Sequence, residues 1–387
     1  MGVKDVTTMV SNLTGMNSEE ALSLGQVVYS KTQGNAQFCK LFLESLYTEG
    51  LLSFSVKEHK WIYDIEKVRE GTNDASNVLV AAKIDRLGAN VQDILKFASC
   101  LGFVFELEHL RVVLVSEYET FTGKKTLPGT KLAPSQISAT QYDDVLHQLM
   151  GKAVNDGIIV NGKRFGTFTF SHDKIFEAVY SSLPTGLERK QLHVRIGRLL
   201  LEAFPKNDVV SFLAVDHLNQ GSASITASLE RLQLAQRNLS LAQLAIDKFS
   251  SFDRARDFIT AGLSLFPGDD LWTIDYDLAL KMHTIGAQVS VVGESPEVFV
   301  DRGILNSKTF ADKVPLYMTL MSFYGWQNRH EEAVDVGLTV LRTLGEKMPR
   351  KAGKAHVAWE FVLAKRALGN RTDEQILAMP QVKDSRK

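Results

Sequence analysis

Apolar side chains recur three and four residues apart along most of the chain, a spacing typical of helices with one buried face. The pattern is interrupted at 51–63 and at 157–170 by short runs rich in aromatic and β-branched residues, each with polar or turn-forming residues in its middle. Such runs predict β-hairpins. We therefore expect a mainly α fold in which the helices carry short β-hairpins.

The order of these elements divides the chain into four parts. Residues 1–118 are expected to hold helices and a first hairpin of a winged type, and residues 139–185 a winged-helix unit. Residues 119–138 contain turn formers and no apolar period, which indicates a surface loop. Residues 186–387 show only helical stripes separated by short breaks, so we expect helical repeats there.

Two segments of the last part resemble tetratricopeptide (TPR) helices, at 252–267 and 317–345. Ala255 and Ala333 occupy matching places, but they lie 78 residues apart, which is not a multiple of the usual repeat of about 34 residues. The repeats are therefore expected to be degenerate. They predict a TPR-like α-solenoid, a fold whose concave face usually binds other proteins.

Length and composition narrow the class of protein. A chain of 387 residues exceeds what one hydrophobic core usually serves, so we expect two or three domains. Hydrophobic residues make up 44% and charged residues 23%, which excludes a chain that is disordered throughout. The 44 Lys and Arg balance 45 Asp and Glu, so charge alone does not favour nucleic acid or anionic lipid as a partner.

The cysteines and the apolar runs predict the compartment. Cys39 and Cys100 lie in apolar segments and are expected to be buried thiols in a reducing environment. No apolar run reaches the roughly 20 residues of a membrane helix. The first residues have neither a signal-peptide core nor a myristoylation motif. We therefore expect a cytoplasmic protein without membrane contact.

Common catalytic motifs do not occur in the sequence. There is no Gly-x4-Gly-Lys-Ser/Thr phosphate loop, and the Gly-Lys-Lys-Thr of residues 123–126 lacks the upstream glycine and the strand-to-helix context. The nucleophile elbow, the His-Glu-x-x-His motif, a paired Cys-x-x-Cys and the kinase motifs do not occur either. We expect that this chain is not an enzyme and binds no cofactor of its own.

One short segment, Phe-Ser-His-Asp-Lys at 170–174, is a more specific candidate for a functional site. It lies where the second hairpin enters the next helix, with Ser171 as a candidate cap and Asp173 in the first turn. An imidazole can gain or lose a proton near neutral pH and helix N-termini bind phosphate oxygens, so His172 and Asp173 could contact a nucleotide. They could equally serve only to cap and orient the helix.

A third interpretation treats His172 and Asp173 as the metal pair of a helical phosphohydrolase. The candidate further ligands are His147, His193, Asp208 and His217. Because their spacings match no established ligand pattern, we expect no metal at this site.

A series of short motifs runs along nearly the whole chain. In order they are Lys31-Thr32-Gln33-Gly34-Asn35, Trp61-Ile62-Tyr63-Asp64, Asn77-Val78, Ala98-Ser99-Cys100-Leu101-Gly102, Phe170-Ser171-His172-Asp173, Asp216-His217-Leu218-Asn219 and Leu344-Gly345 to Pro349. The series resembles the region downstream of the nucleotide-binding core in STAND-class signalling ATPases. These are predicted AAA-type proteins related to the origin-recognition ATPases, including those fused to protein kinase, histidine kinase or cyclase modules.

The resemblance implies roles for four residues. Gly34 and Asn35 match a Gly-Asn-Pro corner of the helical lid that lies near the adenine, although Ala36 stands where the family prefers proline. His172 and Asp173 match a winged-helix motif that approaches the phosphate of bound ADP. Because neither the phosphate loop nor the Mg²⁺ carboxylate strand is present, ATP or ADP would bind only where another segment or chain supplies the core. The chain is accordingly expected to be a fragment, the product of an incomplete gene model or a degenerate relative.

The leading hypothesis is a non-catalytic regulatory part of such an ATPase. Its helical repeats would bind a partner protein and thereby shift the winged helix and lid relative to the nucleotide core. Two alternatives stay open. The first is a winged-helix regulator that binds nucleic acid through Lys124, Lys125, Lys131, Lys163 and Arg164, and the second is the metal-dependent phosphohydrolase.

Overall fold

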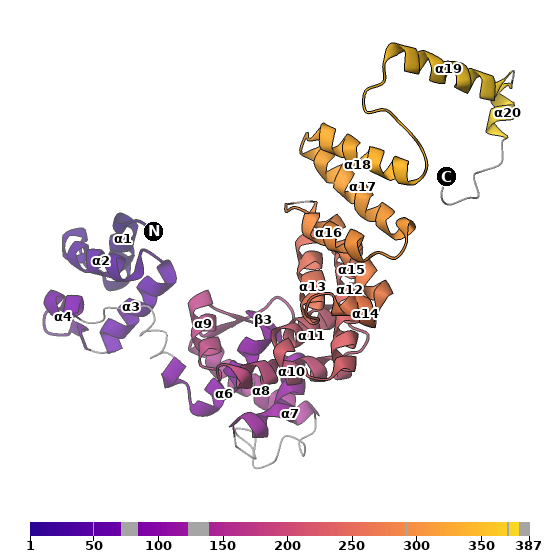
Figure 1. The fold of residues 1–387 in the computed structure, drawn as a ribbon. Coiled ribbons are helices and arrows are strands. Elements are labelled where there is room, and N and C mark those ends of the chain that lie inside the picture. Colours follow the sequence, from indigo (N-terminus) through magenta and orange to yellow (C-terminus); the bar gives the residue numbers. More distant parts are fainter. Residues whose placement is uncertain (49, 71–83, 123–138, 292, 370, 379–387) are drawn as a thin grey trace. The chain divides into compact units, whose positions relative to one another are not determined.

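A computed structural model describes residues 1–48, 50–70, 84–122, 139–291, 293–369 and 371–378 (Figure 1). The chain forms two compact units, Met1–Ala214 and Val215–Lys387. Within these residues helices dominate both units, and the strands form two small antiparallel sheets. The prediction of a mainly α fold with short hairpins, followed by helices alone, is confirmed.

The first unit begins with a set of elements that we call the N-terminal cluster. It consists of α1 (Val3–Thr14), α2 (Ser18–Thr32), α3 (Ala36–Thr48), β1 (Leu52–Ser55), β2 (Lys60–Tyr63) and α4 (Ile65–Glu70). Asn17 starts α2 with a capping box, because its side chain accepts from the N–H groups of Glu19 and Glu20. The apolar faces of α1, α2 and α3 meet in a buried core that includes Val10, Leu24 and Phe42.

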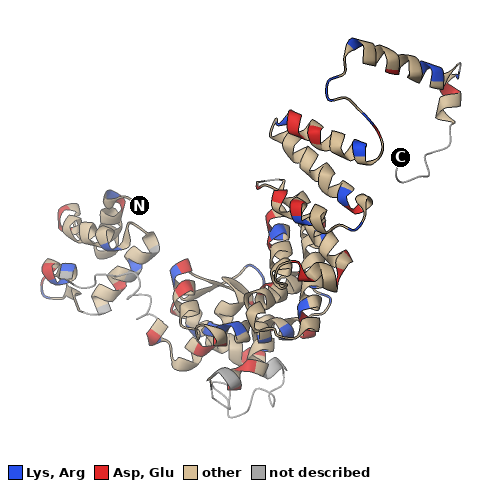
Figure 2. Cartoon of the chain, in the orientation of Figure 1, with Lys and Arg blue, Asp and Glu red and all other residues tan. Residues whose placement is uncertain are grey.

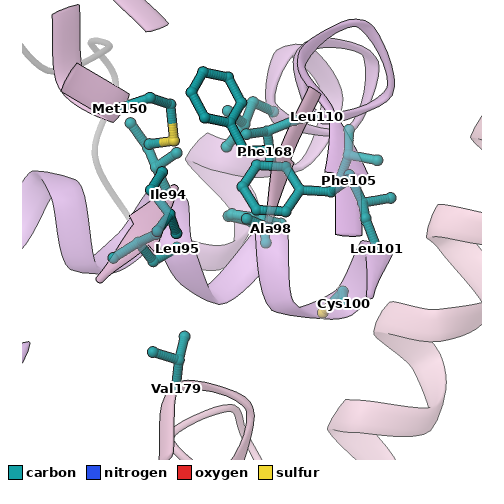
Figure 3. Close-up of a cluster of buried hydrophobic side chains, with 14 of the residues drawn as sticks. Ile94, Leu95, Ala98, Cys100, Leu101, Phe105, Leu110, Met150, Phe168 and Val179 are labelled. Carbon is teal, nitrogen blue, oxygen red and sulfur yellow. The ribbon is translucent and has the colours of Figure 1, made fainter. Parts of the chain in front are cut away.

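The remainder of the first unit contains the elements that we call the central cluster. They are α6 (Ala89–Leu101), β3 (Val104–Glu106), α7 (Leu107–Thr122), α8 (Ala139–Asn155), β4 (Ile159–Asn161), β5 (Thr167–Phe170), α9 (Asp173–Ser181) and α10 (Leu187–Ala203). The three strands form one antiparallel sheet in the order β3-β5-β4, in which Phe105 pairs with Phe168. Residues of α6, α7, α8 and the sheet close over a common core (Figure 3).

The core of the central cluster explains the strand pattern. In β5, Phe168 and Phe170 are buried while the alternating Thr167 and Thr169 are half-buried, as the period of two predicts. The rings of Phe105 and Phe168 stack with centroids 5.8 Å apart. Cys100 is buried in the same core, and burial raises the pKa of its thiol to about 12, so it stays protonated. The expectation of buried thiols is confirmed for Cys100 and for Cys39.

One strand and two predicted boundaries differ from what the sequence predicts. Strand β3 was not predicted, because three residues are too few to show a period of two. Residues 119–122, assigned to the surface loop, form the last turn of α7, while 123–138 lie outside the described residues. Helix α10 lies beyond the predicted boundary at 186, yet its Leu192, Ile196 and Leu200 belong to the core of the first unit. The four-part division stays a prediction.

The second unit is helical throughout its described residues. Its elements are α11 (Asp208–Gln220), within which the boundary between units falls, η2 (Ser222–Ser224), α12 (Ser228–Phe249), α13 (Phe252–Ser264), α14 (Asp270–Ile274), α15 (Tyr276–Ser290), α16 (Glu297–Asn306), α17 (Phe310–Trp326), α18 (His330–Thr343), α19 (Lys354–Leu368) and α20 (Asp373–Leu377). Helices α12, α13, α15, α16, α17 and α18 pack largely in sequence order. None of the described helices is both long enough and apolar enough to cross a membrane.

Close helix packing in the second unit depends on glycine. A Cβ atom at Gly286 in α15 would lie 2.7 Å from ring atoms of Phe299 in α16. We expect Gly286→Ala to lower the free energy of unfolding by about 1–3 kcal/mol through overpacking. Gly325→Ala in α17 is the matched control, because nothing lies within 4 Å of its Cβ and the helix gains up to about 1 kcal/mol. Urea denaturation of both variants measures the difference, and equal stability would contradict the packing.

Candidate functional site

His172 lies at the turn from β5 into α9 and forms the N-cap of that helix. Its Nδ1 accepts a hydrogen bond from the backbone N–H of Lys174 at 3.1 Å. Ser171, the expected cap, instead donates its Oγ hydrogen to the carbonyl of Gly157 at 2.7 Å, which ties the strand end to the loop before β4. The position of His172 is therefore fixed from both sides, by the sheet and by the helix.

Asn35 lies at the corner between α2 and α3. Gln33 and Gly34 both have positive φ, and a Cβ at Gly34 would approach the ring of Tyr29 to 2.9 Å, so glycine suits this corner. The side-chain Oδ1 of Asn35 accepts from the backbone N–H of Phe38 at 3.2 Å. Asn35 thus caps α3 in the way that His172 caps α9.

The structure brings these two corners together across 137 residues of sequence. Asn35 Nδ2 lies 3.3 Å from His172 Nε2. The ring of Phe38 lies against the imidazole with centroids 4.6 Å apart. Phe38 is buried and belongs to the core of the central cluster, although it comes from α3. We call Asn35, Phe38 and His172 the Asn35–His172 junction.

The hydrogen bonds of Asn35 and His172 to the backbone determine which of their atoms are donors at this junction. Nδ1 of His172 accepts from a backbone donor, so a neutral ring carries its proton on Nε2. Oδ1 of Asn35 also accepts from a backbone donor, so its amide nitrogen faces His172. Two N–H donors therefore face each other. An acceptor oxygen, such as a phosphate or carboxylate oxygen, could accept a hydrogen bond from each of these groups.

The surroundings leave the junction open to solvent. Asn35 is exposed and His172 is half-buried, so a ligand reaches both without displacing the core. Gly34 is buried, and its positive φ shapes the corner. Asp173 is exposed in the first turn of α9, where a carboxylate is favoured by the helix N-terminus. Of the four residues expected at a site, Asn35 and His172 are in contact, while Gly34 and Asp173 lie next to them in sequence.

Sequence reasoning missed Phe38. Its position three residues after the cap, at the start of the apolar face of α3, indicates that Phe38 is buried. The pattern does not indicate that its ring enters the core of a different cluster.

Two substitutions at His172 separate its roles. His172→Ala removes the α9 cap and is expected to lower the free energy of unfolding of the first unit by about 1 kcal/mol. His172→Asn keeps an N-cap acceptor and is expected to change stability little, while its shorter side chain no longer reaches Asn35 or Phe38. Chemical denaturation of both variants measures the cap. A loss in His172→Asn as large as that in His172→Ala would contradict this assignment.

The metal interpretation receives no support from the geometry. Within the described ranges, no three His, Cys, Asp or Glu lie close enough to hold a metal ion. His193 is buried and its Nε2 lies 2.9 Å from the hydroxyl of Tyr180. His147 packs its ring against Phe165 and Phe168. Both histidines thus contact aromatic side chains.

Comparison with known proteins gives two likenesses. No family model matches the chain. The hybrid signal transduction histidine kinase G of Dictyostelium discoideum is 27% identical over 73% of this chain, and the chain spans only 9% of the length of that relative. The second is a crystal structure of a STAND protein with a tetratricopeptide repeat sensor from Pyrococcus horikoshii. The alignment covers 96% of this chain and 54% of the Pyrococcus chain, with 14% sequence identity and a TM-score of 0.31. Neither likeness establishes membership of a family.

Proposed function

We propose that the chain is a regulatory part of a signalling protein, without catalysis of its own, in which the Asn35–His172 junction responds to a nucleotide. The observation that carries the proposal is the contact between Asn35 Nδ2 and His172 Nε2, at 3.3 Å. It joins the two segments whose motifs resemble the adenine-side and phosphate-side elements of STAND-class ATPases. The similarity to a hybrid signal transduction histidine kinase of Dictyostelium is consistent with a role in signalling.

The position of His172 supports a mechanical role. We infer that α6, β3, α7, α8, β4 and β5 form a winged-helix unit, from the order of these elements and the sheet order β3-β5-β4. His172 lies two residues after the end of the central strand of that sheet, and Phe38 inserts from the N-terminal cluster. A ligand that binds both donors would favour the arrangement in which the two clusters meet.

The size of such an effect is bounded by differential affinity. A ligand shifts the equilibrium between joined and separated clusters only as far as its affinity differs between these two arrangements. The corresponding coupling free energy is typically about 1–3 kcal/mol. The nucleotide would bind tightly only with a phosphate cradle, and this sequence contains no Gly-x4-Gly-Lys-Ser/Thr loop. The proposal therefore places the core in another segment or chain, with the helical repeats of the second unit binding a protein partner.

NMR titration tests the nucleotide part of the proposal. At millimolar ADP, the Nε2–H signal of His172 and the side-chain amide signal of Asn35 are expected to shift together, and Asn35→Ala is expected to abolish the shift of His172. An ATP turnover assay on the same preparation is expected to stay at background. Turnover by the chain, or ADP shifts confined to residues away from the junction, would contradict the proposal.

Nucleic-acid binding is a second candidate function, favoured by one observation. Phe165 is 95% exposed at the turn between β4 and β5, next to Lys163 and Arg164. An exposed aromatic ring beside cations is typical of single-stranded nucleic-acid surfaces. On most described helices, however, basic residues occur together with acidic ones (Figure 2). Fluorescence anisotropy with a labelled oligonucleotide is expected to show binding only at low salt. Binding at physiological salt that Phe165→Ala removes would favour this second function.

A further inference from the structure

A cavity lies between the end of α18 and the start of α19. Its volume is about 630 Å³, within the usual range for ligand pockets. The residues that line it are Arg342, Lys347, Met348, Pro349 and His356, and we call it the α18–α19 pocket. Arg342 lies in the last turn of α18, and His356 lies in the first turn of α19. The pocket is therefore built from two helix ends and the connection between them.

The charged side chains of the pocket all have the same sign. Arg342 and Lys347 are cationic, and His356 becomes cationic when it gains a proton. In the part of the chain that the structure describes, no acidic residue lines the pocket and these three side chains have no ion-pair partner. Two other cavities differ, since one has Glu20 beside Lys60 and the other has no charged residue. The α18–α19 pocket thus presents cations that no described carboxylate neutralises.

The start of α19 adds hydrogen-bond donors beside these cations. Gly353 is the N-cap and makes no side-chain cap hydrogen bond, and the first helical hydrogen bond runs from the N–H of Val357 to the carbonyl of Gly353. The N–H groups of the first turn therefore lack a capping side chain, and such groups attract oxyanions. Between residues 342 and 356 the sequence has five Lys and Arg and one acid, Glu346 (Figure 2). Positive charge and N–H donors occur together at this connection.

We propose that the α18–α19 pocket binds a phosphorylated side chain of a partner polypeptide, an inference that rests on the proposed function of the repeats. The charge favours phosphate, because a phosphate monoester carries about −1.5 to −2 at neutral pH and matches two fixed cations better than one carboxylate does. The guanidinium of Arg342 can donate two parallel hydrogen bonds to phosphate oxygens, and the ammonium of Lys347 can donate another. Met348 and Pro349 offer apolar contact to the residues beside the phosphate.

Acidic residues close to the pocket disfavour a long polyanion. Glu331, Glu332 and Asp335 are exposed on α18. Arg350, in the connection between α18 and α19, pairs with Glu331 at 3.3 Å and with Asp335 at 2.9 Å, so this acidic cluster lies beside the connection. A nucleic acid or an anionic membrane that entered the pocket would also meet these carboxylates and be repelled. A single phosphate on a polypeptide avoids this repulsion.

Segments of the chain itself complement the pocket less well. The acidic cluster of α18 is already paired, since Arg329 contacts Glu332 at 3.0 Å and Arg350 contacts the other two carboxylates. A second copy would therefore have to break these pairs in order to bring the cluster into the pocket. Residues 379–387 contain three Lys and Arg and one Asp, so they would bring like charge. A modified partner instead brings an unpaired dianion.

Peptides of matched sequence test the proposal. Fluorescence anisotropy follows the binding of short labelled peptides to the whole chain, with apolar residues on both sides of a central phosphoserine, aspartate or serine. The phosphoserine peptide is expected to bind at least about tenfold more tightly than the aspartate peptide, because the phosphate offers more charge and more acceptors. The serine peptide is expected to bind more weakly than both. Equal binding of the phosphoserine and aspartate peptides would overturn the proposal.

Two variants locate the binding. Arg342→Gln removes a cation of the pocket and is expected to weaken the phosphoserine peptide at least about tenfold. Arg366→Gln is the matched control, because it removes the same charge from an exposed residue of α19 that does not line the pocket, and it is expected to leave binding unchanged. Arg342 is exposed too, so both variants are expected to fold. Equal weakening in the two variants would mean that net charge alone drives binding, and would overturn the proposal.

Three further ligands identify the source of the phosphate. Inorganic phosphate, a single-stranded oligonucleotide and vesicles that contain phosphatidylserine are each expected to bind more weakly than the phosphoserine peptide. If one of them binds as tightly as this peptide and Arg342→Gln removes its binding, a phosphorylated partner is overturned as the occupant. Self-association of the chain that Arg342→Gln abolishes would likewise overturn it, in favour of a second copy.

Failure of this proposal and failure of the proposed nucleotide response are distinguishable. Because ADP also carries phosphate, the ADP titration followed at Asn35 and His172 is repeated with Arg342→Gln. ADP shifts at the junction in this variant, together with no phosphopeptide binding to the unmodified chain, would overturn the pocket alone. Phosphopeptide binding without ADP shifts at the junction would overturn the nucleotide response and leave the pocket standing.

Discussion

Phe170→Ala is expected to lower the free energy of unfolding of the first unit by about 3–5 kcal/mol. Phe170 is 1% exposed at the end of the central strand of the sheet. Its ring lies 5.7 Å from that of Phe105 and 5.4 Å from that of Phe176, measured between centroids. Removing the ring leaves a cavity that these neighbours fill only in part. Urea denaturation followed by circular dichroism measures the loss.

The same substitution is expected to disturb the candidate site, because Phe170 stands two residues before His172. In Phe170→Ala we expect the NMR signals of His172 and Phe38 to broaden under conditions where the unit is still folded. Phe165→Ala is the matched control, since it removes the same side chain from the same hairpin at a position that is 95% exposed. Its stability is expected to change by less than about 0.5 kcal/mol. Similar losses in both variants would contradict the placement of Phe170 in the core.

Acidification is expected to destabilise the first unit between about pH 6.5 and pH 4. Burial, followed by the nearby positive charge of Arg189, lowers the pKa of His193 from 6.5 to about 4. Burial also lowers the pKa of His109 in the same unit. In this pH range the unfolded chain binds a proton at His193 that the folded chain does not. Stability from this group is therefore complete above pH 6.5 and is lost as the pH falls toward 4.

The expected loss is about 3 kcal/mol for His193 alone, since one pKa unit corresponds to about 1.4 kcal/mol. Urea denaturation at a series of pH values measures it. His193→Gln removes the titration while keeping a polar partner for Tyr180, and it is expected to flatten the pH dependence. His59→Asn, at an exposed residue with positive φ, is the control and is expected to leave the pH dependence unchanged. A flat profile in the unmodified protein would contradict the burial of a neutral His193.

Local features of the fold could be predicted from the sequence because they depend on neighbouring residues. The capping box at Asn17, the corner at Gly34 and the turn after β4 follow from residue types within a few positions. The hairpins were recognised for the same reason. Strand β3 was not, because its partner β5 lies more than 60 residues away and its three residues carry no period of their own.

The candidate site could be predicted only in part. His172 was recognised as a residue at a helix start, and Asn35 as a residue at a corner, but no spacing rule connects positions 137 residues apart. Their pairing was suggested by resemblance, and the packing of Phe38 against His172 could not be derived from either segment. The pair of Glu117 and Arg195, at 2.7 Å, is another contact between distant residues that only the tertiary fold reveals.

Nuclear Overhauser spectroscopy of the unmodified chain tests the central claim most directly, namely that the Asn35–His172 junction joins the N-terminal cluster to the central cluster. We expect cross-peaks between ring protons of Phe38 and His172, because their ring centroids lie 4.6 Å apart. We also expect nitrogen shifts that show an unprotonated Nδ1 and a protonated Nε2 in a neutral His172 ring. No such cross-peaks in a chain with both clusters folded, or a proton on Nδ1, would contradict the account.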